Sequence, residues 1–443
     1  MDKRKTIALF LFTLLTRLAV GWQSLLSPSA SVLPDSFGYF PLAEKLMQGS
    51  FPSIFRTPGY PLFLAITGAR PGSTALAVVV QMLLDCFTAV LLAHIVWRLL
   101  RNASASLLTG VLWALCPVAA AISPICMSET LFMFLAVAAF YLALSRSLLV
   151  VVLGQGLCWS AAALTRPAGV LLPLIICFFI IILRQTDRAR RLALSACLLI
   201  YILVLGAWAG FNYYRAGYAN LTSVGDVYIY GHLVHAVSMA DEVSWLRYTR
   251  LWVLNPREGE VLRLANERRF IREALQRSNS VPPAWADDAK LADSLSESGD
   301  DYFHTKLWST IDDPATVRWL RAEADEKLKG RLPAILGVHL VGALQTLRPI
   351  PPWGLTGWPG TLIDSLRLLL LPIAFVLLAR RRQWWLLAFC SAWFAYTVFL
   401  PGVCGIWRYR VMAEPAITHA LAFAFSPLIM RWHLWRRFVE GWD

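Results

Sequence analysis

Long apolar segments, separated by short basic or polar ones, dominate this chain. The apolar runs are roughly 17–23 residues long, and a helix of about 20 residues crosses a hydrocarbon core of about 30 Å. We place them at residues 6–26, 74–97, 103–122, 130–145, 148–164, 168–183, 192–212, 361–379, 384–400 and 412–430. This pattern predicts an all-α, polytopic membrane protein with about ten transmembrane helices.

The composition agrees with this prediction. Hydrophobic residues make up 57% of the 443 positions and charged residues only 16%, which leaves too little polar surface for a soluble fold. The net charge of +13 comes mostly from basic clusters beside the apolar runs. It therefore indicates membrane topology, and nucleic acid is not expected as a partner.

The basic clusters predict the orientation of the chain, because Lys and Arg are retained on the cytoplasmic side of a membrane. A ten-span arrangement with the N-terminus inside places every cluster in the cytoplasm. The loop that contains Asp35, the turn 123–129, the long segment 213–361 and the loop 401–410 then all lie outside. The basic clusters are Lys3 to Lys5, Arg98 with Arg101, Arg146, Arg184 to Arg191, Arg380 to Arg382, and Arg431 to Arg437.

Three parts of the chain follow from this topology. Residues 1–212 are expected to form an N-terminal transmembrane module with a first external loop at 28–73, and residues 361–443 a C-terminal transmembrane module. Residues 213–360 form a small helical extracytoplasmic domain, since apolar positions recur there at helical spacing. Its run Leu332–Leu347 is expected to be a helix on the outer interface, because a span there would invert the charge-based orientation.

Two charges fall inside predicted spans. Arg17 interrupts the first apolar run too early for a secretory signal, so we expect an uncleaved first helix whose Arg17 faces other helices. Asp85 lies midway along the second span, where a carboxylate must pair or face a cavity. A structural partnership with a donor on a neighbouring helix is favoured over catalysis.

The cysteines and histidines indicate little chemistry. Most of the eight cysteines lie within predicted spans and are expected to pack as small apolar residues. Cys126 and Cys404 fall on the outer face, where a disulfide is open to them but not favoured. The seven histidines have no zinc-binding spacing, and no Asp-x-Asp pair occurs.

Charged and aromatic residues gather at the predicted outer face. They are Asp35 with Tyr39 on the first external loop, Glu129 at the start of a span, Arg166 at a turn, and Arg408-Tyr-Arg410 before the last span. Any one of them alone is typical of a solvated helix end. Together they place two acids and three arginines at one membrane face, which favours a functional site there.

These motifs resemble the polytopic glycosyltransferases of the C-type fold. The chain is similar to the bacterial protein mannosyltransferases, aminoarabinose transferases and rhizobial lipopolysaccharide core glycosyltransferases, over residues 1–212 and 361–430. The motifs are Asp35 with Tyr39, Ala43, Leu46 and Gly49, then Pro58-Gly-Tyr-Pro61, Asp85, Ser128-Glu-Thr-Leu-Phe132, Leu164-Thr-Arg-Pro167, and Arg408-Tyr-Arg-Val-x-Ala-Glu-Pro415.

The resemblance implies a multi-pass enzyme of the bacterial inner membrane. It would take a sugar from a polyprenyl-phosphate carrier and pass it to a glycolipid, lipopolysaccharide, polysaccharide or protein acceptor at the periplasmic face. Asp35 is the candidate base for the acceptor proton. Glu129 would orient Asp35 or the acceptor, or bind a divalent cation; no cofactor is assigned.

Arginines are expected to bind the departing lipid phosphate, because paired donors stabilise its growing charge in the transition state. The candidates are Arg166, Arg408 and Arg410, although a second role open to Arg166 is to neutralise a buried acid such as Asp85. The candidate substrate-binding residues are Tyr39, Arg56 and Tyr60. The missing Asp-x-Asp pair suits a donor without a nucleotide diphosphate.

Two other classes stay open. A lipid-linked sugar flippase or transporter would show charges along a path through the membrane and broken, paired helices, and no internal repeat is seen here. A polysaccharide polymerase or ligase would place arginines and a histidine in its large external loop, where His232, His235 and His304 are scattered. The sequence favours the glycosyltransferase over both.

Overall fold

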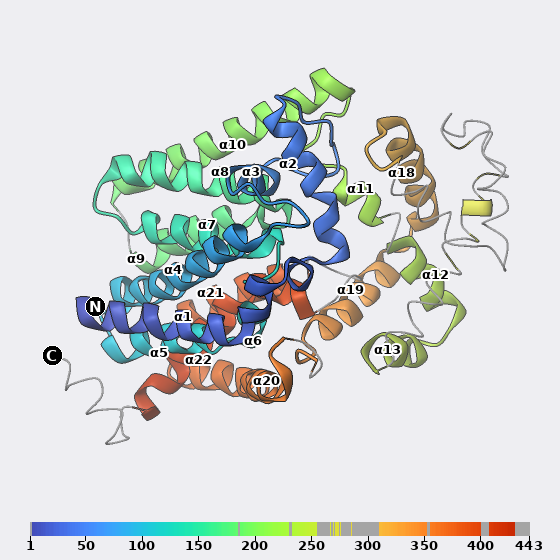
Figure 1. Cartoon of the computed structure of the whole chain (residues 1–443). Helices are drawn as coiled ribbons and strands as arrows, with labels where there is room; N and C mark the ends of the chain where they lie inside the picture. The colour runs from blue at the N-terminus through green and yellow to red at the C-terminus, as the bar shows by residue number, and fades with distance from the viewer. Residues whose placement is uncertain are drawn as a thin grey trace.

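The computed structural model is mainly helical in its described part, which comprises residues 2–184, 187–229, 233–254, 310–351, 355–399 and 407–429, with 266, 269, 271–273, 275 and 285. Within these residues no β-strand forms, and the only extended pairing is an isolated bridge between Arg70 and Ser73. The prediction of an all-α fold is therefore confirmed for these residues (Figure 1).

The N-terminal helices form one bundle. α4 (Ala75–Leu100) lies at its centre and packs against α1 (Lys3–Leu26), α5 (Ala103–Ala114) and α7 (Ser128–Ala143). α7 in turn packs on α8 (Gly156–Thr165). The predicted span at residues 103–122 is divided, because Pro117 lacks the backbone N–H that would continue α5 and begins a short helix, α6 (Pro117–Ile122), instead.

The C-terminal helices return to this bundle. α22 (Glu414–Ile429) packs against α5, α20 (Gly357–Arg380) and α21 (Trp384–Phe399), so the two ends of the chain share a core (Figure 1). α9 (Leu172–Arg184) and α10 (Arg188–Ala216) complete the membrane part. This arrangement brings the segment before α22 close to the first external loop.

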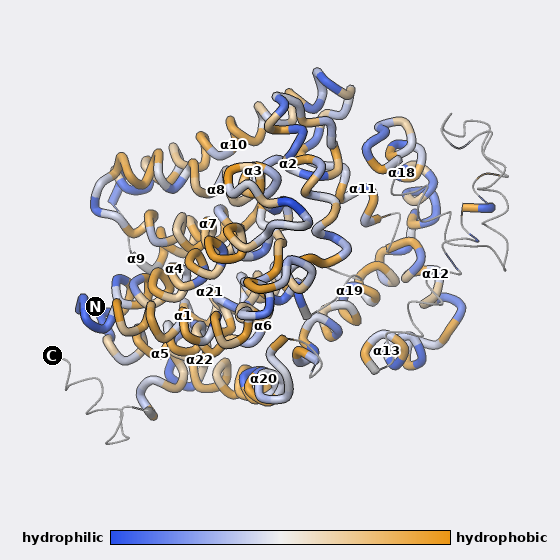
Figure 2. The backbone as a smooth tube through the Cα atoms, viewed as in Figure 1, coloured by the Kyte–Doolittle hydropathy of each residue, from blue (hydrophilic) through white to orange (hydrophobic). Residues whose placement is uncertain are grey.

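The protein is an integral membrane protein. Among the described residues, four helices, α1, α4, α10 and α20, are long and apolar enough to cross a bilayer. Large apolar side chains point outward from them, including Leu199, Ile202 and Leu203 on α10, and Figure 2 shows hydrophobic residues along most of their length. Such a surface is stable only in contact with lipid. The count of about ten spans stays a prediction, since α5, α7, α8, α9 and α21 are shorter apolar helices.

The part predicted to be external, which we call the external part, is helical where the structure describes it. It contains α11 (Val224–Tyr228), α12 (Val234–Glu242), α13 (Trp245–Leu254) and α18 (Pro314–Leu328). The expected helix at residues 332–347 is present as α19 (Leu332–Thr346), which packs against α12, α13 and α21. Its position at the membrane interface and the other domain boundaries stay predictions.

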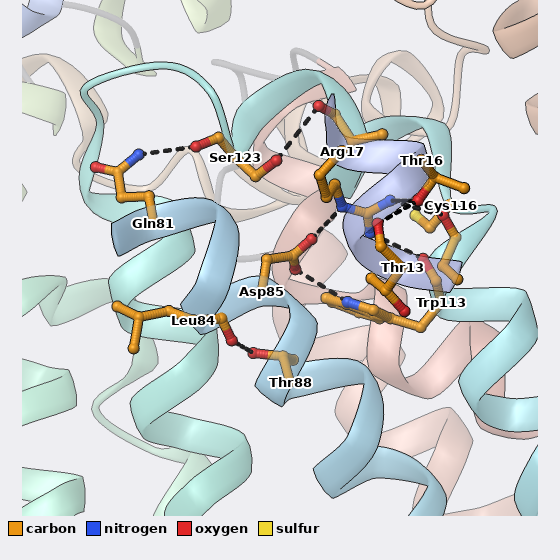
Figure 3. Close-up of polar contacts among 12 residues, drawn as sticks. Thr13, Thr16, Arg17, Gln81, Leu84, Asp85, Thr88, Trp113, Cys116 and Ser123 are labelled. Atoms are coloured by element: carbon orange, nitrogen blue, oxygen red, sulfur yellow. Dashed lines mark hydrogen bonds and ion pairs between the residues drawn. The ribbon is translucent and has the colours of Figure 1, made fainter. Parts of the chain in front are cut away.

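A buried ion pair joins α1 and α4 (Figure 3). The fully buried Arg17 donates from Nε to Asp85, and its other nitrogens donate to the carbonyl oxygens of Ala114 at 2.6 Å and Trp113 at 3.1 Å. The Trp113 indole donates to the second carboxylate oxygen of Asp85 at 3.0 Å. The predictions that Arg17 faces other helices and that Asp85 has a structural partner are confirmed. That partner is Arg17, and Arg166 does not serve Asp85.

Candidate active site

The first external loop places Asp35 above the start of α7. Pro34 begins a short 3-10 helix, η2 (Pro34–Gly38), with Asp35 in its first turn. The Ser36 hydroxyl accepts a hydrogen bond from the Leu33 amide at 3.0 Å and contacts the Met127 sulfur at 3.4 Å. The loop is therefore fastened to the residue that precedes α7, which is the helix carrying Glu129.

Two acids and two arginines meet at this point, and we call Asp35, Glu129, Arg166 and Arg408 the outer charge cluster. One terminal nitrogen of Arg408 donates to Asp35 at 2.6 Å, and its Nε lies 3.5 Å from Glu129 Oε1. Arg166 lies 3.1 Å from the same Glu129 oxygen and donates to the Ser128 hydroxyl at 3.2 Å. The four charges sum to zero, so the cluster is neutral without a ligand.

Exposure differs among the members of the outer charge cluster. The Glu129 side chain is fully buried and those of Arg166 and Arg408 are 14% exposed, whereas that of Asp35 is 44% exposed. Asp35 is thus the acid that a reactant arriving from solvent can reach. Glu129 lies behind the arginines and can act only by holding them.

The arginines set the protonation state of Asp35. Burial alone raises the pKa of Asp35, but the charge and hydrogen bond of Arg408, with the charges of Arg56 and Arg166, bring that pKa below its ordinary value. Burial lowers the pKa of Arg408, whereas Glu129, Tyr409 and Asp35 raise it further than burial lowers it. At neutral pH Asp35 is therefore an ionised carboxylate beside a guanidinium ion.

Tyr409 holds both arginines from one side. The guanidinium carbons of Arg166 and Arg408 each lie 5.2 Å from the centre of its ring, within the range of a cation–π contact. The Nε atoms of both arginines are buried and have no hydrogen-bond partner among the described residues. The side chains of both arginines nevertheless remain 14% exposed, and two guanidinium groups at a partly open site suit an anionic ligand with several oxygens.

The loop–helix motif around Gly59 explains how Arg166 reaches the cluster. α3 (Gly59–Ile66) packs on the end of α8, and a Cβ at position 59 would lie 2.6 Å from the Thr165 hydroxyl and 2.7 Å from the Leu164 carbonyl oxygen. Only glycine allows this approach. At the other side of this contact, α8 ends at Thr165 and Pro167 begins a new turn. Arg166, between them, points toward Glu129.

The candidate substrate-binding residues form a stack beside the cluster. Arg56 lies over the Tyr39 ring at 4.5 Å and donates to the Tyr39 hydroxyl at 3.0 Å, and that hydroxyl donates to Ser128 at 3.4 Å. Tyr60 packs edge-on against Tyr39 at 4.9 Å but is fully buried, and its hydroxyl donates to Gln81 at 2.7 Å. Arg56 and Tyr39 therefore border the site, whereas Tyr60 supports Tyr39 from beneath.

The structure does not bring Arg410 to this site. Arg410 is fully buried, donates to Glu414 at 2.9 Å, pairs with Asp364, and donates to the Arg348 carbonyl oxygen at 2.7 Å. Its segment, η7 (Trp407–Met412), is a 3-10 helix, in which residues two apart point in different directions. The donor-phosphate role expected of Arg410 thus has no support in the geometry.

The sequence analysis did not identify the partners of Arg410. Arg367 donates to Glu414 at 2.8 Å, and Asp364 accepts from the Ile350 amide at 2.8 Å. We call Asp364, Arg367, Arg410 and Glu414 the inner charge cluster; all four are nearly fully buried. The sequence did contain a signal for this cluster. Asp364 and Arg367 are charged residues inside the predicted span 361–379, and intramembrane charges must pair.

Nothing in the described part of the chain forms a metal site. Among those residues, no three His, Cys, Asp or Glu side chains are grouped so that they could hold an ion. Asp35 and Glu129 both face guanidinium groups, which compete with a cation for the carboxylate oxygens. Cys126 is buried and free, and its suggested partner Cys404 lies outside the described residues.

Comparison with solved structures finds proteins of similar fold. Two solved structures of ArnT from Cupriavidus metallidurans are similar to this chain, one bound to undecaprenyl phosphate and one in the apo state. The first is 14% identical with a TM-score of 0.38 and covers 96% of this chain and 78% of its own; the second is 14% identical with a TM-score of 0.39 and covers 95% and 76%. No family model and no curated protein matches. The case for a function therefore rests on the residues of the site.

Proposed function

We propose that this protein is a membrane glycosyltransferase that moves a sugar from a polyprenyl-phosphate donor to an acceptor at the outer, periplasmic face. The observation that carries the proposal is the outer charge cluster, in which a half-exposed carboxylate, Asp35, adjoins two partly exposed arginines, Arg166 and Arg408. This combination suits a reaction that needs both a proton acceptor and a site for a departing phosphate. The sequence motifs that resemble C-type glycosyltransferases contain the same residues.

The reaction assigns a task to each group. The acceptor hydroxyl attacks the anomeric carbon, its proton passes to Asp35, and the electrons of the broken carbon–oxygen bond remain on the lipid phosphate. Arg166 and Arg408 stabilise that phosphate, whose negative charge grows as the bond breaks. Glu129 is fully buried behind the two arginines and keeps them in place throughout.

The ion pair between Asp35 and Arg408 gives the reaction an order. Without a donor, Arg408 holds the carboxylate at 2.6 Å and lowers its pKa, which makes Asp35 a weak base. A donor phosphate competes with Asp35 for the same guanidinium group. Once Arg408 turns to the phosphate, Asp35 is released and its pKa rises toward the ordinary value, so the base is ready only when the donor is bound.

The alternatives fit the described charges less well. A flippase or transporter would need charges along a path, but Asp85 is closed by Arg17 and Trp113, and the inner charge cluster is closed on itself. For a polymerase or ligase centred on the external loop, His232 and His304 lie outside the described residues and His235 is fully buried. The transferase is therefore the function that we propose.

The proposal is tested with purified protein in liposomes that contain polyprenyl-phosphate-linked hexose, pentose or aminopentose, with envelope glycolipid as the acceptor. Asp35→Asn keeps the size and removes the proton acceptor, so transfer should fall by about two to four orders of magnitude. Glu44→Gln, on the exposed face of α2 (Phe40–Met47), is the matched control and should transfer normally. Donor that crosses the bilayer without transfer would indicate a flippase, and near-normal turnover in Asp35→Asn would exclude Asp35 as the base.

The outer location of the site needs its own measurement. Ser36 is fully buried, so the neighbouring Phe37, which is 56% exposed, is the position to use. Cysteines placed at Phe37 and Gln383 should react differently with a membrane-impermeant reagent added outside, with labelling at position 37 only. Cysteines at Ser296 and Gly402 should also be labelled, and a cysteine at Gln185 should not. The structure does not describe these three positions. Labelling at Gln383 from outside would move the site to the cytoplasmic face.

A further inference from the structure

The segment that carries Arg56 is held by the external part of the protein. The carboxylate oxygen Oδ1 of Asp312 accepts three hydrogen bonds, from the Ser53 hydroxyl at 2.8 Å and from the amides of Ile54 at 2.8 Å and Phe55 at 2.9 Å. Asp312 precedes α18 and is separated from this loop by more than 250 positions in the sequence. A charged acceptor that binds three donors fixes the path of the loop more firmly than a neutral one would.

Ser53 passes this constraint to Arg56. While its hydroxyl donates to Asp312, it also accepts from the Arg56 amide at 2.9 Å and from the Phe55 amide at 3.2 Å. The Arg56 side chain then donates to the Tyr39 hydroxyl at 3.0 Å. A continuous series of hydrogen bonds therefore leads from Asp312 to the border of the outer charge cluster.

Other contacts attach the same loop to the segment that follows α10. Arg215 donates to the carbonyl oxygens of Phe51 at 2.5 Å and Ser53 at 2.9 Å. The Ser223 amide donates to the carbonyl oxygen of Ile54 at 2.9 Å. Ile54 is 1% exposed and belongs to the apolar core of the external part, together with Val317 and Trp319 of α18. The loop is thus attached to the external part, while the Arg56 side chain contacts Tyr39 beside the outer charge cluster.

We propose that Asp312 is a positioning residue that fixes Arg56 over Tyr39 and so couples acceptor binding by the external part to the outer charge cluster. The inference rests on the proposed function and deepens it, because Arg56 becomes the contact between the two parts. Arg408 and Arg166 lie against Tyr409 beside the last membrane helices and suit the lipid phosphate, whereas Arg56 lies on the external side and suits the acceptor.

The charge of Arg56 supplies a readout that a purely structural role would not change. Arg56 is one of the groups that lower the pKa of Asp35. If the loop is released and Arg56 moves away, the pKa of Asp35 rises. Transfer requires ionised Asp35, so on acidification it is lost at a higher pH than in the wild type. The acid limb of the pH–rate profile therefore moves to higher pH.

The test compares Asp312→Ala with Asp313→Ala. The two acids are adjacent, but Asp313 caps α18, accepting from Thr316 at 2.9 Å, and does not hold the loop. Hydrogen exchange of a peptide covering residues 51–57 should lose protection in Asp312→Ala and retain it in Asp313→Ala. Asp312→Asn keeps an acceptor oxygen and should retain most of the protection, and Ser53→Ala replaces Asp312→Ala if that variant does not fold.

Kinetics of the same variants complete the experiment. In Asp312→Ala the KM for acceptor should rise about tenfold, the size expected for a lost charge-assisted hydrogen bond, and the acid limb should move to higher pH. Hydrolysis of donor without acceptor should be unchanged. Unaltered protection in Asp312→Ala, or lost protection with normal acceptor kinetics, would overturn the inference. A wild type without transfer would refute the proposed function instead, and exchange at residues 51–57 would still decide whether Asp312 positions Arg56.

Discussion

Replacing Glu129 by Gln separates the electrostatic role of this acid from its shape. The substitution keeps the volume and one acceptor oxygen but removes a buried negative charge that lies 3.1 Å from Arg166 and 3.5 Å from Arg408. The outer charge cluster then changes from neutral to a net charge of +1. Two consequences follow, one for stability and one for the binding of a lipid phosphate.

The stability loss follows from the burial of the pair. Breaking a fully buried ion pair costs about 3–5 kcal/mol, because the remaining charge stays desolvated. The arginine side chains are 14% exposed, and Gln still accepts a hydrogen bond, so we expect the lower end, about 3 kcal/mol. Unfolding in mixed detergent–SDS micelles measures this difference, with Glu44→Gln as the exposed control.

The effect on ligand affinity has the opposite sign. Without Glu129 the two arginines attract a phosphate more strongly, so polyprenyl phosphate should bind about tenfold tighter, while transfer falls because the guanidinium groups are no longer held in place. Added polyprenyl phosphate should therefore stabilise Glu129→Gln more than it stabilises the wild type. Unchanged stability, or weaker phosphate binding than in the wild type, would refute this reasoning.

Three further predictions concern the other charges. The pairing of Asp35 with Arg408 lowers the pKa of Asp35 in the free enzyme, so this stabilisation is present above the ordinary pKa and lost as the pH falls through the lowered one; in Arg408→Ala the acid limb of kcat/KM for the donor, which reports the free enzyme, should move to higher pH. Arg408→Ala should also cost about 2–4 kcal/mol of transition-state stabilisation with normal protein yield, whereas Arg410→Ala should lower the yield, as turnover per folded molecule would reveal. Asp85→Asn should destabilise the bundle by about 3 kcal/mol, because it leaves Arg17 buried without its counter-ion, and it should leave donor affinity unchanged; normal stability in denaturant would contradict this.

Local patterns in the sequence predicted most of the membrane helices. Apolar runs are directly visible there, and the break before Pro117 was missed because the run was judged by its hydropathy and the proline was not weighed as a helix break. The interior position of Arg17 also followed from the sequence, since an arginine in lipid is costly. These predictions succeeded because each depends on the chemistry of a single segment.

The site was predictable only in part. Topology placed Asp35, Glu129, Arg166 and Arg408 on one face, and the structure brings them into contact. The same argument included Arg410, because residues adjacent in sequence were assumed to share a location. The backbone conformation of η7, which separates them, depends on packing against distant helices and has no signature in the sequence.

The hydrogen bonds of Asp312 illustrate a second limit. They join positions more than 250 residues apart, and neither the loop nor the acid has an unusual composition. Asp312-Asp-Pro314 has the composition of an ordinary helix start, and α18 does begin at Pro314. Long-range partners of this kind are visible only once the chain has folded.

The different surroundings of Arg408 and Arg410, the two arginines of η7, should constrain sequence variation among relatives differently. Arg408 faces an open site, where its partners can change with the substrate, whereas Arg410 is fixed by Asp364 and Glu414 in a closed and neutral group. Loss of any one member of that group would leave a buried charge uncompensated. Among relatives we therefore expect Asp364, Arg367, Arg410 and Glu414 to be kept or replaced together, while position 408 varies independently of them. Such joint variation would identify distant members of the family even where the active-site residues have diverged.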